Sequence, residues 1–203
     1  MRTIPLILGI GGTTRAGSGS EMAMRAILAA AELLGAQTAV LTNDDLDLPI
    51  YVPGRVPPAA AKLIDLVRRC DGLLIATPAY HGGISGLVKN AIDYIEELRT
   101  DERPYLEARA VGCIVCAGGA QAIGVTLISC RSIVHALRGW PTPLGIGINM
   151  SAQPVNEGLP FAQGPVGQQL SALAAQVVEF ARLQALARDV QVAGSQDTSV
   201  AYR

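Results

Sequence analysis

The stretch that decides the fold is IPLILGIGGTTRAGSGSEM, residues 4–22. Residues 4–10 form a continuous apolar run that ends in glycine, which is typical of a buried strand. Residues 11–22 hold four glycines, two threonines, two serines and one arginine, and they lie directly before a segment with helical periodicity. A strand, a small polar loop and a helix in this order form the repeating unit of α/β proteins. The stretch therefore predicts that further units of this kind follow along the chain.

Four more apolar runs do follow, each joined to the next by a helical pattern. Further strands are expected at residues 37–42, 72–78, 108–119 and 142–150. Helices are expected at residues 18–34, 58–69, 87–98, 123–137 and 166–180. Five strands alternating with five helices predict an α/β fold, with a parallel sheet covered by helices on both faces. The sheet is expected to have five strands in the order 2-1-3-4-5.

Size and composition indicate one domain. The chain has 203 residues, 50% of them apolar, and a formal net charge of −1, which favours neither a nucleic acid nor an anionic membrane as partner. We expect one domain over residues 1–190 and a disordered tail over 191–203, where periodicity is absent. No apolar run is long enough to cross a membrane, and the short one near the N-terminus is better explained as a strand than as a signal peptide. A cytoplasmic protein is therefore expected.

Two of the four cysteines, Cys113 and Cys116, form a C-x-x-C motif of the kind found in redox and metal sites. On the expected strand 108–119, positions three apart point to opposite faces, so these thiols could neither share a metal nor close a disulfide. Buried thiols are expected instead, with Cys130 also in the core on the apolar stripe of its helix. No metal site is predicted.

The loop within residues 11–22 has the chemistry of an anion-binding site. Ser18 and Glu21 form a capping box, which predicts that the helix starts near Ser18, and the free N–H groups of a helix N-terminus attract an anion. Arg15 adds a fixed positive charge that can form two parallel hydrogen bonds. The candidate phosphate-binding residues are Thr13, Thr14, Arg15, Ser18 and Ser20. The alternative is a capped turn that binds nothing, since serine and glycine are common in ordinary turns.

Two familiar phosphate-binding motifs fail on this loop. The P-loop pattern fits from Gly12 to Gly17, but Ser18 stands where its lysine is required, which argues against triphosphate chemistry. The dinucleotide pattern fits at Gly9 and Gly11, but Thr14 stands where its last glycine is required. A single terminal phosphate remains, such as a mononucleotide presents.

Two more glycine-containing loops are expected at the same edge of the sheet. TPAYHGGISG (77–86) follows the third strand and CAGGAQ (116–121) follows the fourth. In the order 2-1-3-4-5, strands 1 and 3 are neighbours, so the loop at 77–86 should face the first loop. Pro78 is expected to end the third strand, and Gly82 and Gly83 to let the backbone approach a flat ligand. Tyr80 can pack near such a ligand.

Several residues in these loops, and one charged pair on the helix after the second loop, also have purely structural interpretations. His81 is more simply a solvent-facing loop residue than a catalyst. Gly118 and Gly119 could merely form a tight turn between strand and helix. Lys89 and Asp93, four residues apart on one helix face, are interpreted as a surface or interface ion pair.

The first two loops resemble signatures of the NADPH-dependent FMN reductase family. GGTTRAGSGS (11–20) resembles the family's phosphate loop, G-[ST]-x-R-x-x-S-x-[NST]. TPAYHGGISGLVKNAIDY (77–94) resembles its longer signature, T-P-x-Y-[NH]-x-x-x-x-G-x-L-K-N-x-[IL]-D. The similarity continues through AGGA (117–120) and LRGWPTPLG (137–145), so it covers residues 4–150.

The resemblance implies a flavodoxin-like three-layer sandwich that binds FMN and takes a hydride from NADPH or NADH. Matched by position, the residues that would hold the FMN phosphate are Thr13, Arg15, Ser18 and Ser20. Those that would line the flavin ring are Pro78, Ala79, Tyr80, His81 and Gly82, with Ala117, Gly118 and Gly119 at its other edge. Ala79 replaces a common glutamate and His81 a common asparagine, which bears on substrate preference rather than on flavin binding. Thr13 and Ser20 replace a frequent serine and asparagine, which changes little chemically.

Hydride transfer is the cofactors' own chemistry, so no catalytic acid or base is predicted, and backbone N–H groups near Gly82 and Gly119 are expected to polarise the ring. Three other functions stay open. They are a quinone, azo or chromate reductase with FMN as a fixed cofactor, a flavodoxin-type electron carrier, and a phosphate-binding module. The small net charge argues against the carrier. The resemblance also implies a homodimer or homotetramer, with residues 84–98 and 123–137 as candidate faces, and a flavin-dependent monooxygenase as a partner that would use the reduced flavin.

Overall fold

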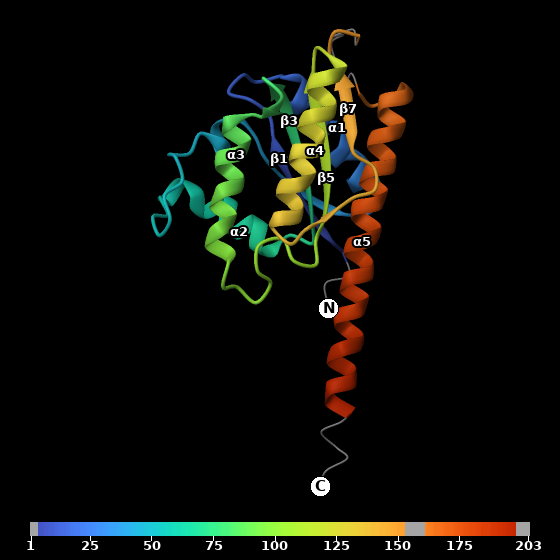
Figure 1. Cartoon of the computed structure of the whole chain (residues 1–203). Helices are drawn as coiled ribbons and strands as arrows, with labels where there is room; N and C mark the ends of the chain where they lie inside the picture. Colours follow the sequence, from blue (N-terminus) through green and yellow to red (C-terminus); the bar gives the residue numbers. More distant parts are fainter. Residues whose placement is uncertain (1–3, 153–160, 198–203) are drawn as a thin grey trace.

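A computed structural model describes residues 4–152 and 161–197, which form an α/β structure around a twisted sheet (Figure 1). The strands are β1 (Leu6–Gly11), β2 (Gln37–Leu41), β3 (Gly72–Tyr80), β4 (Gly83–Ile84), β5 (Ala110–Ala117), β6 (Trp140–Pro141) and β7 (Ile146–Asn149). The helices are α1 (Gly19–Leu33), α2 (Pro58–Arg69), α3 (Gly86–Asp93), α4 (Ala120–Ala136) and α5 (Gly164–Asp197). Two 3₁₀ segments, η1 (Asn43–Leu46) and η2 (Tyr94–Leu98), complete the described elements.

The class of fold predicted from the sequence is confirmed, but its strand count is wrong. The described sheet has seven strands rather than five, and its path is β2-β1-β3-β5-β6. All pairings along this path are parallel, and β7 also lies parallel to β5. The extra members are β4, which runs antiparallel to β3, and a fifth strand position that is divided between β6 and β7.

The division of the fifth strand follows from its local sequence. A single strand was expected over residues 142–150, but the chain leaves the sheet between β6 and β7. Pro143 has no N–H to give to a neighbouring strand. The N–H of Leu144 donates instead to Oε1 of Gln176 on α5, at 3.1 Å, and the hydroxyl of Thr142 donates to the carbonyl of Leu144, at 2.8 Å. The backbone N–H and carbonyl of Leu144, which would extend a strand, therefore bond to side chains instead of to a neighbouring strand.

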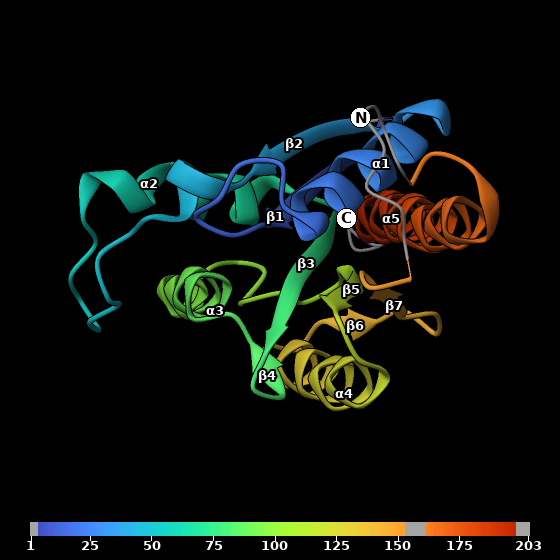
Figure 2. The same ribbon diagram turned by 90° about the horizontal axis from the view of Figure 1, so that it is seen from above.

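Helices cover both faces of the sheet, as Figure 2 shows from above. One buried apolar cluster joins the sheet to α1 and α5, and the other joins it to α2, α3, η2 and α4. Strand β5 contributes to both, since Cys113 lies in the cluster with α4 and Cys116 in the cluster with α1 and α5. The two thiols of the C-x-x-C motif therefore lie on opposite faces, as predicted, and all four cysteines are free and buried.

Helix α5 is longer than its apolar pattern indicated. The predicted helix ended at residue 180 and a disordered tail was expected from 191, whereas α5 continues to Asp197 and extends past the sheet (Figure 1). The part of the tail prediction that concerns residues 198–203 lies outside the described residues. Among the helices of the described residues, none is both long and apolar enough to cross a membrane.

Candidate functional site

Three loops meet at the carboxyl edge of the sheet, as the predicted strand order required. Strand β3 lies between β1 and β5, with Gly11 beside Ala76 and Pro78 beside Cys116 near the strand ends. The loops that leave these strands are residues 12–18, 81–82 and 118–119. In parallel sheets, ligands bind at this edge, where the strand order reverses. The β1–β3 boundary is such a point, because the chain passes from β1 outward to β2 and then back to β3.

The first loop carries the expected helix cap. Ser18 has an extended backbone, and its hydroxyl accepts a hydrogen bond from the N–H of Glu21 at 3.3 Å, so α1 starts at Gly19 as the capping box predicted. The hydroxyls of Ser18 and Ser20 are buried and lie 3.4 Å apart. The first turn of α1 thus places two hydroxyls next to N–H groups that have no partner within the helix.

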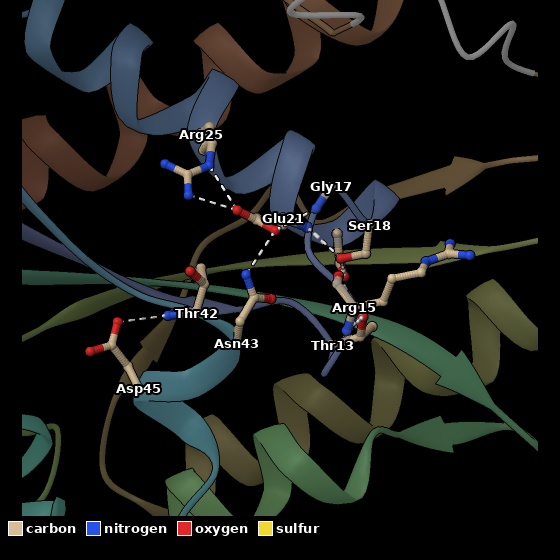
Figure 3. Close-up of polar contacts among 10 residues, drawn as sticks. Thr13, Arg15, Gly17, Ser18, Glu21, Arg25, Thr42, Asn43 and Asp45 are labelled. Carbon is tan, nitrogen blue, oxygen red and sulfur yellow. Dashed lines mark hydrogen bonds and ion pairs between the residues drawn. The ribbon is translucent and has the colours of Figure 1, made fainter.

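The outer part of this loop is more exposed. Thr14 and Arg15 are exposed and Thr13 is half-buried, and Figure 3 shows the Arg15 side chain pointing away from Glu21. The hydroxyl of Thr13 accepts from the N–H of Arg15 at 3.0 Å and donates to the carbonyl of Arg15 at 3.1 Å, which shapes the loop tip. The structure thus brings the predicted phosphate residues into one loop, with the guanidinium at the tip and the two serine hydroxyls at the base.

The carboxylate of Glu21 accepts more hydrogen bonds than a capping box requires. Its carboxylate is 5% exposed and accepts from the N–H of Gly17 at 2.9 Å, from Nδ2 of Asn43 at 3.1 Å, and from Nε and Nη2 of Arg25 at 2.9 and 2.6 Å (Figure 3). Burial raises the pKa of this carboxyl, but the hydrogen bonds from Asn43, Arg25 and Gly17, with the positive charge of Arg25, outweigh burial and lower the pKa below its ordinary value. The group is therefore a firmly ionised, fully hydrogen-bonded carboxylate.

The second loop is a β-hairpin rather than an open loop. Pro78 was expected to end the third strand, but β3 continues through it to Tyr80, and β4 folds back so that Ala79 pairs with Ile84. The two residues at the turn, His81 and Gly82, both have positive φ, at 53° and 81°, which is the pattern of a type I′ turn. Histidine tolerates this conformation better than most residues, so its turn position accounts for it without a catalytic role.

The hairpin is anchored at its base and open at its tip. The buried hydroxyl of Thr77 accepts from the N–H of Ser85 at 3.0 Å and donates to the carbonyl of Pro78 at 2.9 Å. Tyr80 and His81 are exposed, whereas Pro78, Ala79 and Gly82 are half-buried. Tyr80 was expected on a loop, whereas the structure places it as the last residue of β3, the strand that pairs with β1.

The third loop is short and leads directly into α4. Gly119 is the N-cap of that helix and offers no side-chain cap, while Gly118 is exposed and Ala117 is half-buried. The next strand closes against this loop, because the N–H of Met150 donates to the carbonyl of Ala117 at 2.8 Å and the hydroxyl of Ser151 donates to that of Gly118 at 3.2 Å. A second helix N-terminus, this one without a side-chain cap, therefore borders the same edge.

The sequence interpretation missed several residues at this edge. Asn43, Thr77, Met150 and Ser151 were not singled out, and Glu21 was assigned only a capping role. Asn43 could have been found, since it directly follows the strand that pairs with β1 and so lies at the same edge. Met150 and Ser151 could not, because the end of the fifth strand was not separated from a continuous run.

The sheet order and the helices on both faces define a flavodoxin-like α/β protein, and its switch point carries an exposed guanidinium and a hydroxyl-rich helix N-terminus. The sequence of the chain matches the model of the NADPH-dependent FMN reductase family over residues 5–152. The chain belongs to this family, which confirms the resemblance seen in the two loops.

Individual relatives agree with the family assignment. An NAD(P)H-dependent FMN reductase of Pseudomonas aeruginosa is 33% identical over 105 residues, which are 49% of this chain and 53% of that enzyme. An NADPH azoreductase of a Bacillus species is 30% identical over 137 residues, which are 66% of this chain and 68% of that enzyme. The chain thus spans about half to two thirds of the length of these relatives.

Solved structures share the fold at low sequence identity. A structure titled RosB, with a bound riboflavin-5′-phosphate derivative, has a TM-score of 0.69 at 16% identity and covers 95% of this chain and 87% of its own. The apo form of an NADH:FMN oxidoreductase has a TM-score of 0.64 at 19% identity, covering 87% of this chain and 88% of its own. These likenesses establish the flavodoxin-like fold of the chain.

Proposed function

We propose that this protein is an NAD(P)H-dependent FMN reductase, which transfers a hydride from NADPH or NADH to FMN. The observation that carries the proposal is the turn from β1 into α1, where Arg15 and the hydroxyls of Ser18 and Ser20 lie at the N-terminus of α1, at the edge where the neighbouring β3 also ends. Family membership supports the same activity. The family's own description names both FMN and NADPH.

The residues present fit FMN chemically. A phosphate needs several donors, and the serine hydroxyls, the first-turn N–H groups of α1 and the guanidinium of Arg15 supply them. Thr13 and Thr14 lie on the same loop and can add hydroxyls. The flavin ring would lie along the hairpin and the third loop, lined by Pro78, Ala79, Tyr80, His81 and Gly82 and by Ala117, Gly118 and Gly119. Glycines at both places let a planar ring approach the backbone closely.

The chain's own residues are proposed to bind and orient rather than to exchange protons. FMN, when bound, supplies the hydride-accepting chemistry. Arg15 and the serines fix the phosphate end, and Tyr80 restricts one face of the site. Backbone N–H groups near Gly82 and Gly119 would donate hydrogen bonds to the ring. No side-chain acid or base is required, because His81 is accounted for by its turn.

The assay for this proposal is steady-state oxidation of NADPH with FMN as acceptor, followed at the nicotinamide absorbance band and repeated anaerobically. The proposal expects turnover that saturates with both FMN and NADPH. Binding of FMN without any nicotinamide oxidation would contradict it and would favour a non-enzymatic carrier of the flavodoxin type. Riboflavin in place of FMN should raise the apparent KM, because it lacks the phosphate.

A second candidate is a reductase that keeps FMN as a fixed cofactor and passes electrons to an azo compound, a quinone or chromate. The observation that favours it is the similarity to a protein named NADPH azoreductase over 68% of that protein's length. The two candidates differ in how tightly FMN is held. An FMN dissociation constant far below the apparent KM for FMN would indicate a fixed cofactor, and similar values would indicate a substrate.

The assembly of the chain is proposed to be a homodimer or homotetramer. Two large apolar side chains on α4, Val125 and Ile128, are 52% and 68% exposed, and Val125 lies close to Gly82 of the hairpin. Exposed apolar side chains that cluster on one helix are typical of a protein interface.

If FMN acts as a substrate, a flavin-dependent monooxygenase is the proposed recipient of its reduced form. The proposed location of both proteins is the cytoplasm.

A further inference from the structure

A single carboxylate, that of Glu21, joins three separate segments around the first loop. Its four hydrogen bonds come from Gly17 at the end of the loop, from Arg25 one turn further along α1, and from Asn43 just after β2. Figure 3 shows the carboxylate between the arginine and the asparagine. The position of residues 16–18 relative to β2 therefore depends on this one side chain.

The hydrogen bond to Gly17 departs from the usual capping box in a way that matters for an anion. In that motif the glutamate accepts from the N–H of the N-cap residue, which here is Ser18. Glu21 accepts instead from Gly17, one residue earlier, where the backbone has a positive φ of 69°. The N–H of Ser18 has no acceptor among the described residues, so it is left available at the start of the helix.

Asn43 has a left-handed backbone, which asparagine adopts more readily than most residues, and a side-chain amide that Glu21 orients. Its φ of 46° lies in the left-handed region, and its Oδ1 is buried without a partner among the described residues. A Cβ added at Gly12, where the loop begins, would lie 3.4 Å from that oxygen. The bond from Nδ2 to Glu21 fixes which way the amide faces. A buried oxygen without a partner is a local conflict of the kind that occurs at functional sites.

The charges of the network are balanced, which suits a neighbouring phosphate. A lone carboxylate at the N-terminus of α1 would repel a dianion. Arg25 contacts the carboxylate through two nitrogens and offsets its charge, while Arg15 at the loop tip stays outside the network. The structure thus separates a neutralised pair that shapes the loop from a cation that can meet the ligand.

We propose that Glu21 and Asn43 are positioning residues that set the loop of residues 12–18 to recognise a terminal phosphate, and that they thereby make the site selective for phosphorylated over unphosphorylated flavin. The inference rests on the proposed function, since it concerns the same site. Neither side chain is required to touch the ligand. Glu21 acts through the Gly17 and Ser18 backbone, and Asn43 acts through Glu21.

The test is a set of equilibrium titrations with FMN and with riboflavin, on the wild type and on Glu21→Ala, Glu21→Gln and Asn43→Gly. Glycine suits the positive φ at position 43, so Asn43→Gly removes the side chain without adding backbone strain. We expect Glu21→Ala to weaken FMN about tenfold or more and riboflavin less than about twofold. Asn43→Gly should weaken FMN several-fold, and Glu21→Gln, which keeps one acceptor oxygen, should fall between wild type and Glu21→Ala.

The matched control is Glu32→Ala, which removes an exposed carboxylate from the other end of α1 and should leave both affinities unchanged. Equal losses for FMN and riboflavin in the variants would overturn the inference, because a merely structural role affects both. If Glu21→Ala does not fold, as judged by circular dichroism, the same criterion applies to Asn43→Gly and Glu21→Gln. A wild type that binds neither flavin would overturn the proposed function as well, whereas an unchanged FMN preference in all variants would overturn the inference alone.

Discussion

At the scale of single residues, two glycines with the same chemistry have opposite structural roles. A Cβ at Gly11 would lie 2.4 Å from the carbonyl oxygen of Ala76 on β3, where the strands beside the site must stay close. A Cβ at Gly124, in the interior of α4, would meet nothing within 4 Å. The first glycine is required by close approach of two backbones, and the second is only a weak point in a helix.

We therefore expect Gly11→Ala and Gly124→Ala to change stability in opposite directions. Gly11→Ala should lower the free energy of unfolding by about 2 kcal/mol or more, as overpacking against backbone does. Gly124→Ala should raise it by roughly 0.5–1 kcal/mol through helix propensity. Urea denaturation of the two variants measures both values, and a neutral Gly11→Ala would contradict the strand spacing described for β1 and β3.

At the scale of elements, the parts of the fold that periodicity dictates were predictable from the sequence. The continuous apolar runs of β1, β3 and β5 and the Ser18 N-cap of α1 lie where the sequence placed them, and Lys89 and Asp93 form the expected ion pair at 2.6 Å. The β3–β4 hairpin and the division of β6 from β7 were missed. Both depend on single backbone choices, a left-handed His81 and a proline at 143, which override the apolar pattern.

The same distinction applies to the candidate site. Its loops could be predicted, because strand order alone places them at one edge. The bond between Asn43 and Glu21 joins residues 22 positions apart, and it depends on the exact reach of a side chain across two elements. No periodicity carries that information.

Strand β5 leads to a prediction for the thiols. Cys113 and Cys116 are buried on opposite faces, and burial raises the pKa of Cys116 to about 12. The pKa of Cys113 is raised as well, mainly by a hydrogen bond with Cys130 and secondly by burial. Because thiolates are the reactive form, a thiol reagent at mildly alkaline pH should label the native protein very slowly and all four cysteines rapidly in denaturant. Fast labelling of the native protein would contradict the packing of β5.

Helix α1 leads to a prediction for pH. The pKa of Glu21 is lower in the folded protein than its ordinary value of 4.5, so its ionised form stabilises the fold. That contribution is complete above the ordinary pKa and is lost as the pH falls through the lowered one. Glu21→Gln should therefore be less stable than wild type at neutral pH, and the difference should shrink on acidification. Denaturation midpoints across an acid series measure this, and a constant difference would exclude an ionised Glu21.

At the scale of the whole molecule, α4 carries the exposed apolar surface that we propose for oligomer assembly. Its exposed Val125 lies close to Gly82 of the hairpin, and its exposed Ile128 follows three residues later, so a second copy on this face would also border the site. Ile128→Lys should convert the proposed oligomer to monomer, as measured by light scattering coupled to gel filtration. Leu33→Lys, at an exposed position on α1, is the control that should leave the mass unchanged. An Ile128→Lys variant of unchanged mass would place the interface elsewhere.

Equilibrium titration with FMN and with riboflavin, on wild type and on Arg15→Ala, tests whether a terminal phosphate binds the N-terminus of α1. Wild type should prefer FMN, and Arg15→Ala should weaken FMN by about tenfold, because a charge-assisted hydrogen bond contributes about 1.5–3 kcal/mol. Riboflavin affinity should stay unchanged, as should both affinities in the distant control Arg55→Ala. Equal losses of FMN and riboflavin in Arg15→Ala, or a wild type without preference, would contradict the account.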